Sequence, residues 1–153
     1  QFASDYYVQL TDVFAKQGLK PTFSVERVRL LMKHLLPTGN LLLVRARNAE
    51  GNCIATGIYP AFRRTMYFWG GASLRQFQLL QPNEPVQWLA MRYWKERGAT
   101  SCDMGGGGDY KQKYGGKALI IPWCRKSRYW WVAGMRGAAQ TGHELLRRVS
   151  GRF

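Results

Sequence analysis

The sequence predicts a domain of the α/β (α+β) class, in which helices flank a mixed, mostly antiparallel sheet. In several segments, apolar residues recur at helical spacing, whereas other segments are short, apolar and bounded by turn residues, as strands are. A strong helix precedes the last of the central strands, and such a crossover makes that strand parallel to an earlier one. With 153 residues, of which 46% are hydrophobic, the chain is long enough to bury a core.

Two helices open the predicted order. The first spans Ser4–Lys16, where aromatic and aliphatic residues return every three or four positions until Gly18. The second begins at Ser24, a residue that favours helix N-termini, and it ends at Pro37 and Gly39.

Three strands then form a predicted meander. We expect them at Leu41–Asn48, Cys53–Phe62 and Thr65–Trp69. The first turn contains Gly51, which tolerates the backbone of a tight hairpin, and the second is the basic pair Arg63–Arg64.

The clearest helix spans Pro82–Gly98. Pro85 lies in its first turn, where a missing N–H costs nothing. Its predicted inner face consists of Val86, Leu89, Ala90, Tyr93 and Trp94. We also place Trp88 in the core, which would turn Gln87 toward the cleft.

The remaining elements follow the crossover helix. They are a strand at Thr100–Met104, a short helix at Asp109–Tyr114, a hairpin of Leu119–Trp123 and Tyr129–Val132, and a closing helix at Thr141–Val149.

The chain is strongly basic, with a net charge of +14. The segment Met104–Phe153 carries ten Lys and Arg residues against two acidic residues, a net charge of +8. Such a segment is typical of proteins that bind a polyanion, such as nucleic acid, a phosphorylated cofactor or anionic lipid, although a solvated basic surface has the same composition. Trp123, Trp130 and Trp131 are interpreted as packing residues, with stacking on RNA as the alternative.

Several classes of protein are disfavoured. No apolar run reaches the roughly 18 residues of a membrane span, and the amino end lacks the pattern of a signal peptide. The chain begins at Gln1 rather than Met, so a preceding domain stays an open alternative. The three cysteines form no CxxC pair or cluster with histidine, so we expect reduced thiols, a cytoplasmic protein and no metal site.

Glycines and small polar residues follow two predicted strands, where open sheets bind ligands. Glycine lets a ligand approach the backbone and leaves N–H groups to bind a phosphate or an oxyanion. A plain flexible loop is the alternative. The predicted donor-binding residues are Gly70, Gly71, Ser73, Gly105 and Gly106, with Lys113 and Tyr114 of the next helix.

Three neighbouring side chains are the catalytic candidates. Lys111 can hold a phosphate or the negative oxygen of a tetrahedral intermediate, unless it is a plain surface lysine. Tyr110, or Tyr114, can stack on a base or protonate a leaving group, unless it only packs in the fold. Asp103 either caps the glycine loop or faces the pocket as a base.

These motifs resemble the Fem family of peptidoglycan-bridge aminoacyltransferases and their relatives, the FemAB-like branch of the GNAT acyltransferase superfamily, which includes BioF2-like acetyltransferase domains. The resemblance is sharp over Trp69–Gly116 and extends from about Asp5 to Arg152. It rests on GAS at Gly71–Ser73, LLQPNEPVQW at Leu79–Trp88, CDMGG at Cys102–Gly106 and YKQKYGG at Tyr110–Gly116.

The resemblance implies a GNAT fold and transfer of an acyl group to an amine. Fem proteins move an amino acid from aminoacyl-tRNA to a peptidoglycan precursor, and other relatives use acyl-CoA. By this resemblance Lys111 corresponds to the lysine that stabilises the reacting carbonyl, Tyr110 replaces a phenylalanine, and Asp103 corresponds to the aspartate of the strand.

The chain also departs from the family pattern. Fem proteins carry two tandem GNAT-like domains, whereas this chain resembles only the second. Between Ser73 and Pro82 stands LRQFQLLQ instead of the usual GNAT pyrophosphate loop. This absence counts against the ordinary mode of CoA binding without excluding CoA.

The resulting prediction is one GNAT-like acyltransferase domain over residues 1–153, alone or as the C-terminal half of a two-domain enzyme that is inactive without its other half. It would acylate an amine, such as that of a cell-wall precursor, with acyl-CoA or aminoacyl-tRNA as cosubstrate and no covalently bound cofactor. Its phosphate-binding candidates are Arg63, Arg64, Lys113, Lys117 and Arg125–Arg128. The alternative is a non-catalytic GNAT-like module that binds RNA or a protein partner through its basic face.

Overall fold

A computed structural model of the chain describes residues 1–16, 18–106, 108–122, 124 and 126–150. The chain divides into a first unit, Gln1–Gly116, and a second unit, Lys117–Phe153. The sheet and every predicted catalytic or donor-binding residue lie in the first unit.

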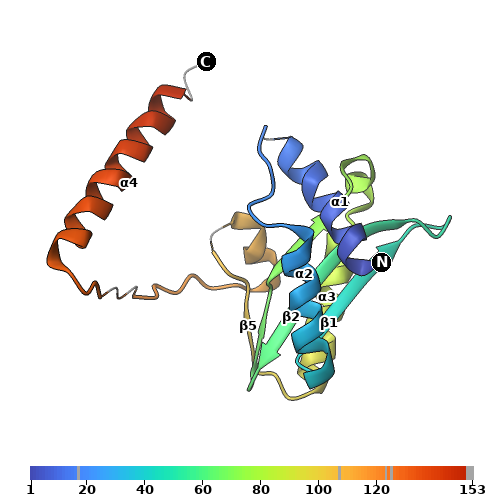
Figure 1. The fold of residues 1–153 in the computed structure, drawn as a ribbon. Coiled ribbons are helices and arrows are strands. Elements are labelled where there is room, and N and C mark those ends of the chain that lie inside the picture. Colours follow the sequence, from blue (N-terminus) through green and yellow to red (C-terminus); the bar gives the residue numbers. More distant parts are fainter. Residues whose placement is uncertain (17, 107, 123, 125, 151–153) are drawn as a thin grey trace. The chain divides into compact units, whose positions relative to one another are not determined.

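The first unit contains the predicted helices and strands in sequence, with a strand at Gly70–Ser73 and a 3₁₀-helix at Arg75–Leu80 as additional elements (Figure 1). Its main elements are α1 (Phe2–Ala15), α2 (Val25–Leu35), β1 (Leu41–Arg47), β2 (Cys53–Phe62), β3 (Thr65–Tyr67), β4 (Gly70–Ser73), α3 (Asn83–Glu96) and β5 (Ser101–Asp103). The 3₁₀-helices are η1 (Leu36–Thr38), η2 (Arg75–Leu80) and η3 (Asp109–Tyr114). The predicted helices before the sheet, the crossover helix and the short helix after the glycines are confirmed, whereas η2 was not predicted.

Strand β2 organises the sheet. One edge of β2 pairs antiparallel with β1, and its other edge pairs antiparallel with β4 at residues 55–58 and with β3 at residues 61–62. Strand β3 pairs in parallel with β5, because α3 carries the chain back across the sheet between them. The predicted mixed, mostly antiparallel sheet flanked by helices is therefore confirmed.

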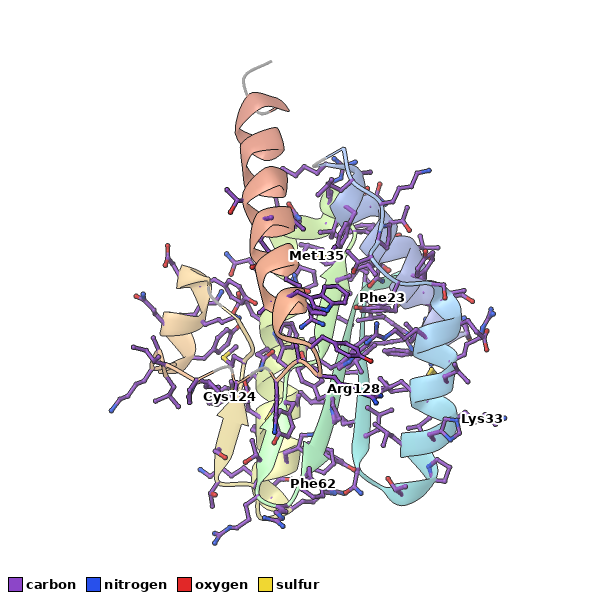
Figure 2. All side chains as sticks on the ribbon, turned by 60° about the vertical axis from the view of Figure 1, so that its left-hand side comes forward. Phe23, Lys33, Phe62, Cys124, Arg128 and Met135 are labelled. Atoms are coloured by element: carbon purple, nitrogen blue, oxygen red, sulfur yellow. The ribbon has the colours of Figure 1, made fainter. Side chains whose placement is uncertain are left out.

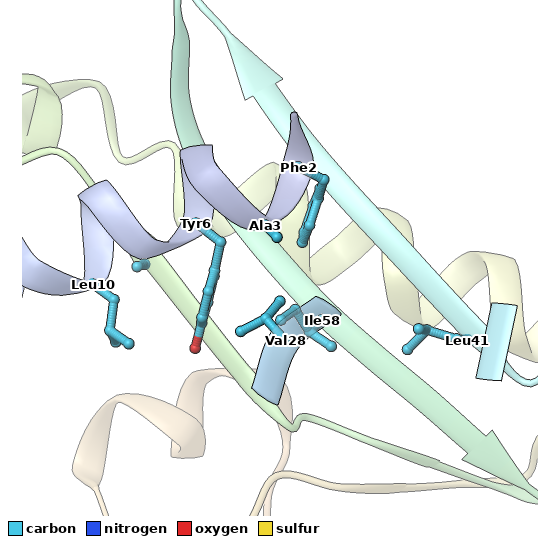
Figure 3. Packing of buried hydrophobic residues seen from close by; sticks show 8 residues of the cluster. Phe2, Ala3, Tyr6, Leu10, Val28, Leu41 and Ile58 are labelled. Carbon is cyan, nitrogen blue, oxygen red and sulfur yellow. The ribbon is translucent and has the colours of Figure 1, made fainter. Parts of the chain in front are cut away.

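Two apolar layers cover the sheet, since successive residues of a strand point to opposite faces. Ile58 of β2 packs on one face with Tyr6 of α1 and Val28 of α2 (Figure 3). The next residue, Tyr59, packs on the other face with Trp94 of α3. Figure 1 shows α1 and α2 on one side of the sheet and α3 on the other. Each fully buried large side chain contributes roughly 1.5–3 kcal/mol, so both layers hold the sheet in place.

The predicted inner face of α3 is partly wrong. Trp88 and Leu89 are 60% and 52% exposed, although both were placed in the core. The buried stripe runs through Val86, Ala90 and Trp94, which are four residues apart and lie on one side of the helix. Trp88 lies two positions from both Val86 and Ala90, so its side chain projects from the opposite side.

A β-bulge separates β3 from β4. Trp69 N–H donates a hydrogen bond to Ile58 O over 3.1 Å, yet the strand register places Gly70 opposite Ile58. Trp69 and Gly70 therefore both lie opposite Ile58, and the extra residue bends the strand. The single strand predicted over Thr65–Trp69 is therefore wrong in its end, since β3 stops at Tyr67. Gly70–Ser73 were expected to follow a strand, but they form the strand β4.

The second unit differs from its prediction. Helix α4 spans Trp130–Ser150, so the predicted strand Tyr129–Val132 is wrong, while the predicted helix Thr141–Val149 lies within α4. The partner strand Leu119–Trp123 is also wrong over its described residues, and Trp123 itself lies outside them. The physical reason is that residues 130–150 contain no proline and repeat apolar residues at helical rather than alternating spacing. Among the described residues, no helix is both long and apolar enough to cross a membrane.

Candidate active site

The sheet opens beyond the end of the parallel pairing between β3 and β5. The last hydrogen bond there joins Phe68 N–H to Asp103 O over 2.8 Å, and the next strand, β4, pairs with β2 but not with β5. Beyond this point β4 stays with β2, since Leu74 N–H donates to Ile54 O over 3.0 Å. Strand alternation then directs the N–H groups of Gly71 and Ser73 away from β2, toward the opened edge.

A cavity of about 320 Å³ lies at this opening. It is lined by Thr56 and Tyr59 of β2, Phe68 and Gly71 of the bulged strand, Asn83, Glu84, Val86 and Gln87 of α3, and Tyr110, Lys113 and Tyr114 of η3. Four of the predicted residues, Gly71, Tyr110, Lys113 and Tyr114, therefore meet at one place. The apolar and aromatic walls with a few polar groups are typical of a small-molecule site.

A second cavity, of about 530 Å³, adjoins the first at the N-terminal end of α3. Its lining includes Ser73 and shares Asn83, Glu84 and Lys113 with the first cavity. Asn83 Nδ2 donates to Ser73 Oγ over 3.0 Å and so ties the start of α3 to β4. Helix N-termini favour anions, but here the first turn already carries the Glu84 carboxylate.

Glu84 joins η3 to α3. Lys113 Nζ forms an ion pair with its Oε1, and Tyr114 Oη donates to its Oε2 over 2.5 Å. The hydrogen bond from Lys113, followed by that from Tyr114, lowers the pKa of Glu84 below its ordinary value. Burial, together with the Glu84 carboxylate, raises the pKa of Tyr114, which therefore stays protonated at neutral pH. These contacts hold η3 along one wall of the cavity.

Sequence reasoning missed Glu84 as a site residue. An acidic residue in the first turn of a helix is an ordinary stabilising feature, and that is the only signal that the sequence contains. Its partner Lys113 comes 29 positions later, so only the fold brings the two charges together.

The glycine loop holds the candidate Lys111. Lys111 Nζ donates to Gly106 O, and it lies 5.7 Å from the centroid of the Tyr110 ring. Lys111 does not line either cavity, whereas Tyr110 lines the smaller one. Burial raises the pKa of Tyr110, so this phenol also keeps its proton at neutral pH.

Asp103 caps the start of the loop. Its Oδ1 accepts a hydrogen bond from Gly105 N–H over 2.7 Å, which agrees with the capping interpretation. The side chain is exposed and does not line either cavity. Gly105 has a φ of +72° and Gly108 one of +139°, values that favour glycine and explain part of the glycine run.

Gln87 faces the smaller cavity, as the sequence analysis expected. Its side chain is 4% exposed, and its Nε2 has no hydrogen-bond partner among the described residues. An unpaired buried amide costs about 1–3 kcal/mol, so its presence at a cavity wall calls for an explanation.

The remaining predicted residues lie elsewhere. Gly70 faces α1, where a Cβ atom would lie 2.6 Å from Tyr6 Oη, so its role in the structure is to admit this tyrosine. Arg63 and Arg64 lie at the turn between β2 and β3, beside the exposed Phe62 (Figure 2), and do not line either cavity. Lys117 belongs to the second unit, and Arg125 lies outside the described residues.

The two cysteines of the first unit are poor nucleophiles. Burial raises the pKa of Cys102 to about 11, and burial also raises the pKa of Cys53, so neither thiol is a ready nucleophile. Within the described part of the chain, no three His, Cys, Asp or Glu side chains gather to hold a metal ion.

Comparison with known proteins gives a consistent result. Residues 3–114 match the model of the acetyltransferase (GNAT) domain. No curated protein matches the chain. Among solved structures, the glucosamine-6-phosphate N-acetyltransferase from Arabidopsis thaliana superposes with a TM-score of 0.55 at 16% identity, over 84% of this chain and 93% of its own.

Two aminoglycoside-modifying enzymes are also similar. The 6'-N-acetyltransferase AAC(6')-IG from Acinetobacter haemolyticus has a TM-score of 0.58 at 13% identity, over 81% of this chain and 92% of its own. AAC(6')-Iy, in complex with a bisubstrate analogue of CoA and acetylneamine, has a TM-score of 0.55 at 14% identity, over 73% of this chain and 86% of its own. At these identities the likeness establishes the fold alone.

Proposed function

Because the chain belongs to the GNAT acetyltransferase family, whose domain model it matches over residues 3–114, we propose that it is a cytoplasmic N-acyltransferase. It would transfer an acyl group from an activated donor to an amine and so form an amide. The observation that carries this proposal is the pair of adjoining cavities at the edge of β4 that faces away from β2, where Gly71 lines the smaller cavity and Ser73 the larger.

The reaction is a direct attack of the amine nitrogen on the carbonyl carbon of the donor. A C–N bond forms, the C–S or C–O bond of the donor breaks, the amine loses a proton and the leaving sulfur or oxygen gains one. Backbone N–H groups at the opened edge suit the carbonyl oxygen, because fixed donors stabilise the charge that develops there.

Three side chains receive roles in this proposal. Lys111 would exchange its present acceptor, Gly106 O, for the negative oxygen of the tetrahedral intermediate. Tyr110, protonated at neutral pH and on the cavity wall, would give its proton to the leaving group. The exposed Asp103 carboxylate, or water, would take the proton of the amine.

The donor is either an acyl-CoA or an aminoacyl-tRNA. The CoA bisubstrate complex of the similar AAC(6')-Iy supports the first. Two features support the second: η2 replaces the usual pyrophosphate loop, and Glu84 places a carboxylate at the start of α3, where that pyrophosphate would lie. The motifs from Trp69 to Gly116 support the finer assignment to the FemAB-like branch, with a cell-wall precursor as the amine acceptor.

A second candidate function is a non-catalytic module that binds RNA. The charge of the chain favours it, since +14 in 153 residues attracts polyanions. Binding of this kind weakens steeply with salt and produces no amide.

The test is a side-by-side titration of the full chain with acetyl-CoA and with an aminoacylated tRNA, each at low and high salt, followed by an assay for amide formation. Saturable CoA binding that survives high salt would identify a CoA-dependent enzyme. Salt-sensitive tRNA binding with turnover would identify the Fem-type donor, and the same binding without turnover would identify the RNA-binding module. Binding of neither ligand would point to a half-enzyme that needs a second domain.

A further inference from the structure

The carboxamide of Gln87 is an unpaired polar group at the wall of the smaller cavity. The side chain is 4% exposed, and its Nε2 is buried without a hydrogen-bond partner among the described residues. Most buried polar side-chain atoms in folded proteins are paired, so an unpaired one usually marks a strained site or a missing ligand.

The neighbouring polar side chains are paired within the protein. Thr56 Oγ1 donates to Gln9 Oε1 over 2.6 Å, and Tyr114 Oη donates to Glu84. These two hydroxyls therefore have partners within the protein, whereas the Gln87 amide nitrogen faces the cavity, where it is open to a ligand.

A second hydrogen-bonding group lines the same cavity. Tyr59 is 1% exposed, and its hydroxyl makes no hydrogen bond to the described residues. Burial raises the pKa of Tyr59, so the hydroxyl stays protonated and can donate. Together, Gln87 and Tyr59 offer N–H and O–H donors and a carbonyl acceptor between apolar walls that include Phe68 and Val86.

The charged residues of the cavity limit which ligand groups Gln87 and Tyr59 could bind. The charged residues on its wall, Glu84 and Lys113, form an ion pair with each other. An ionised carboxylate or phosphate beside Gln87 would thus lack a cation to offset its loss of water. A neutral amide, which both donates and accepts, complements a carboxamide and a phenol.

We propose that Gln87 is a substrate-binding residue that recognises a neutral amide group of the donor arm or of the acceptor. This inference rests on the proposed acyl transfer and adds to it the chemical class of the group that enters the smaller cavity. Gln87 acts in binding and orientation, whereas the bond-making steps belong to other residues.

The decisive variant is Gln87→Met, which keeps the length of the side chain and removes its hydrogen bonds. Because the wild-type amide is unpaired in the free protein, this change should leave Tm unchanged or raise it. The same change should weaken ligand binding by about 5- to 100-fold, the usual effect of removing the partner of a buried polar group. An amide with a purely structural role would give the opposite pattern, a lower Tm with unchanged binding.

Two neutral probes distinguish the source of the amide without any turnover. Pantetheine carries two secondary amides of a donor arm and no phosphate, and a blocked alanine dipeptide represents an amide-bearing acceptor. Calorimetric titration of the full chain with each probe should show that Gln87→Met weakens one of them. Trp88→Phe, on the exposed side of the same helix, is the matched control and should change neither.

Kinetics add a separate readout. Gln87→Met should raise KM for the substrate that carries the recognised amide while kcat stays within about twofold, the sign of a contact made equally in the ground and transition states. Unchanged binding of both probes, or a fall in Tm without weaker binding, would overturn the assignment. If wild-type protein binds a probe through Gln87 yet forms no amide with any donor, the proposed function fails while the binding role stands.

Discussion

The buried pair of Thr56 and Gln9 fixes α1 to the centre of the sheet, and its replacement gives a measurable prediction. Thr56 is 0% exposed and Gln9 2%, and the hydroxyl of Thr56 donates to Gln9 Oε1 over 2.6 Å. Thr56→Val keeps the shape and leaves Gln9 Oε1 unpaired in the interior. Such a loss costs about 1–3 kcal/mol of unfolding free energy.

The assay is urea unfolding of the wild type, Thr56→Val, Gln9→Leu and the double variant. Gln9→Leu also frees Cys53 O, the second partner of Gln9, but this loss is common to the single and double variants and cancels in the cycle. The double variant should therefore lose less than the sum of the single losses, with a coupling of about 0.5–3 kcal/mol. Thr11→Val, which removes an exposed hydroxyl, is the control and should stay within about 0.5 kcal/mol. Additive losses, or a neutral Thr56→Val, would refute the reasoning.

Three further predictions address the site and its support. Lys111→Ala should lower kcat by about 10²-fold or more, as expected for losing one oxyanion donor, while Gln112→Ala on the same 3₁₀-helix should not; near-wild-type turnover would remove Lys111 from the mechanism. Glu84 has a lowered pKa in the folded protein, so its stabilising contacts are complete above its ordinary pKa of 4.5 and are lost as the pH falls through the lower folded value. Tm should thus drop less in Glu84→Gln than in the wild type between about pH 5 and pH 3, and parallel curves would contradict this account. Gly57→Ala should destabilise the domain by about 1–3 kcal/mol in urea unfolding, because the new methyl group would lie 2.6 Å from Tyr59 Oη; a neutral result would show that the buried ring moves freely.

Periodicity was enough to predict most of the first unit. The helical repeat of α1 and α2, the apolar run of β2 and the strong crossover helix each have a local signal that survives in the fold. The bulge at Trp69 has no such signal, since it depends on which residues of β2 lie opposite. The prediction of a strand in the second unit failed for a related reason. Aromatic residues such as Trp131 favour a strand only where a partner strand lies beside them, and the local sequence does not show whether one does.

The sequence indicated those parts of the candidate site that depend on local backbone features. It did not indicate the contacts between side chains that are remote in sequence. Gly70, Gly71, Gly105 and Gly106 were chosen as candidates because strand ends and glycines are local features, and of these four only Gly71 lines the smaller cavity. The opened edge of the sheet brings Gly71, Tyr110, Lys113 and Tyr114 to one cavity. The ion pair of Glu84 was invisible, because its partner is remote in sequence. Gln87 was expected in the cleft on the premise that Trp88 is buried, and that premise proved wrong.

The shared strand β2 has a consequence for how the domain assembles. Its contacts with β1 and β4 close short loops, so this meander can form early and at small entropic cost. The parallel pairing of β3 with β5 joins residues 65–67 to residues 101–103 and must wait until α3 has folded over the sheet. Strand β5 leads into the glycine loop and η3, whose Tyr110, Lys113 and Tyr114 line the cavity, so the most non-local strand pairing of the unit anchors that wall. Local unfolding that releases β5 would dismantle the site while leaving the meander whole, so catalytic competence would be lost before the bulk of the structure.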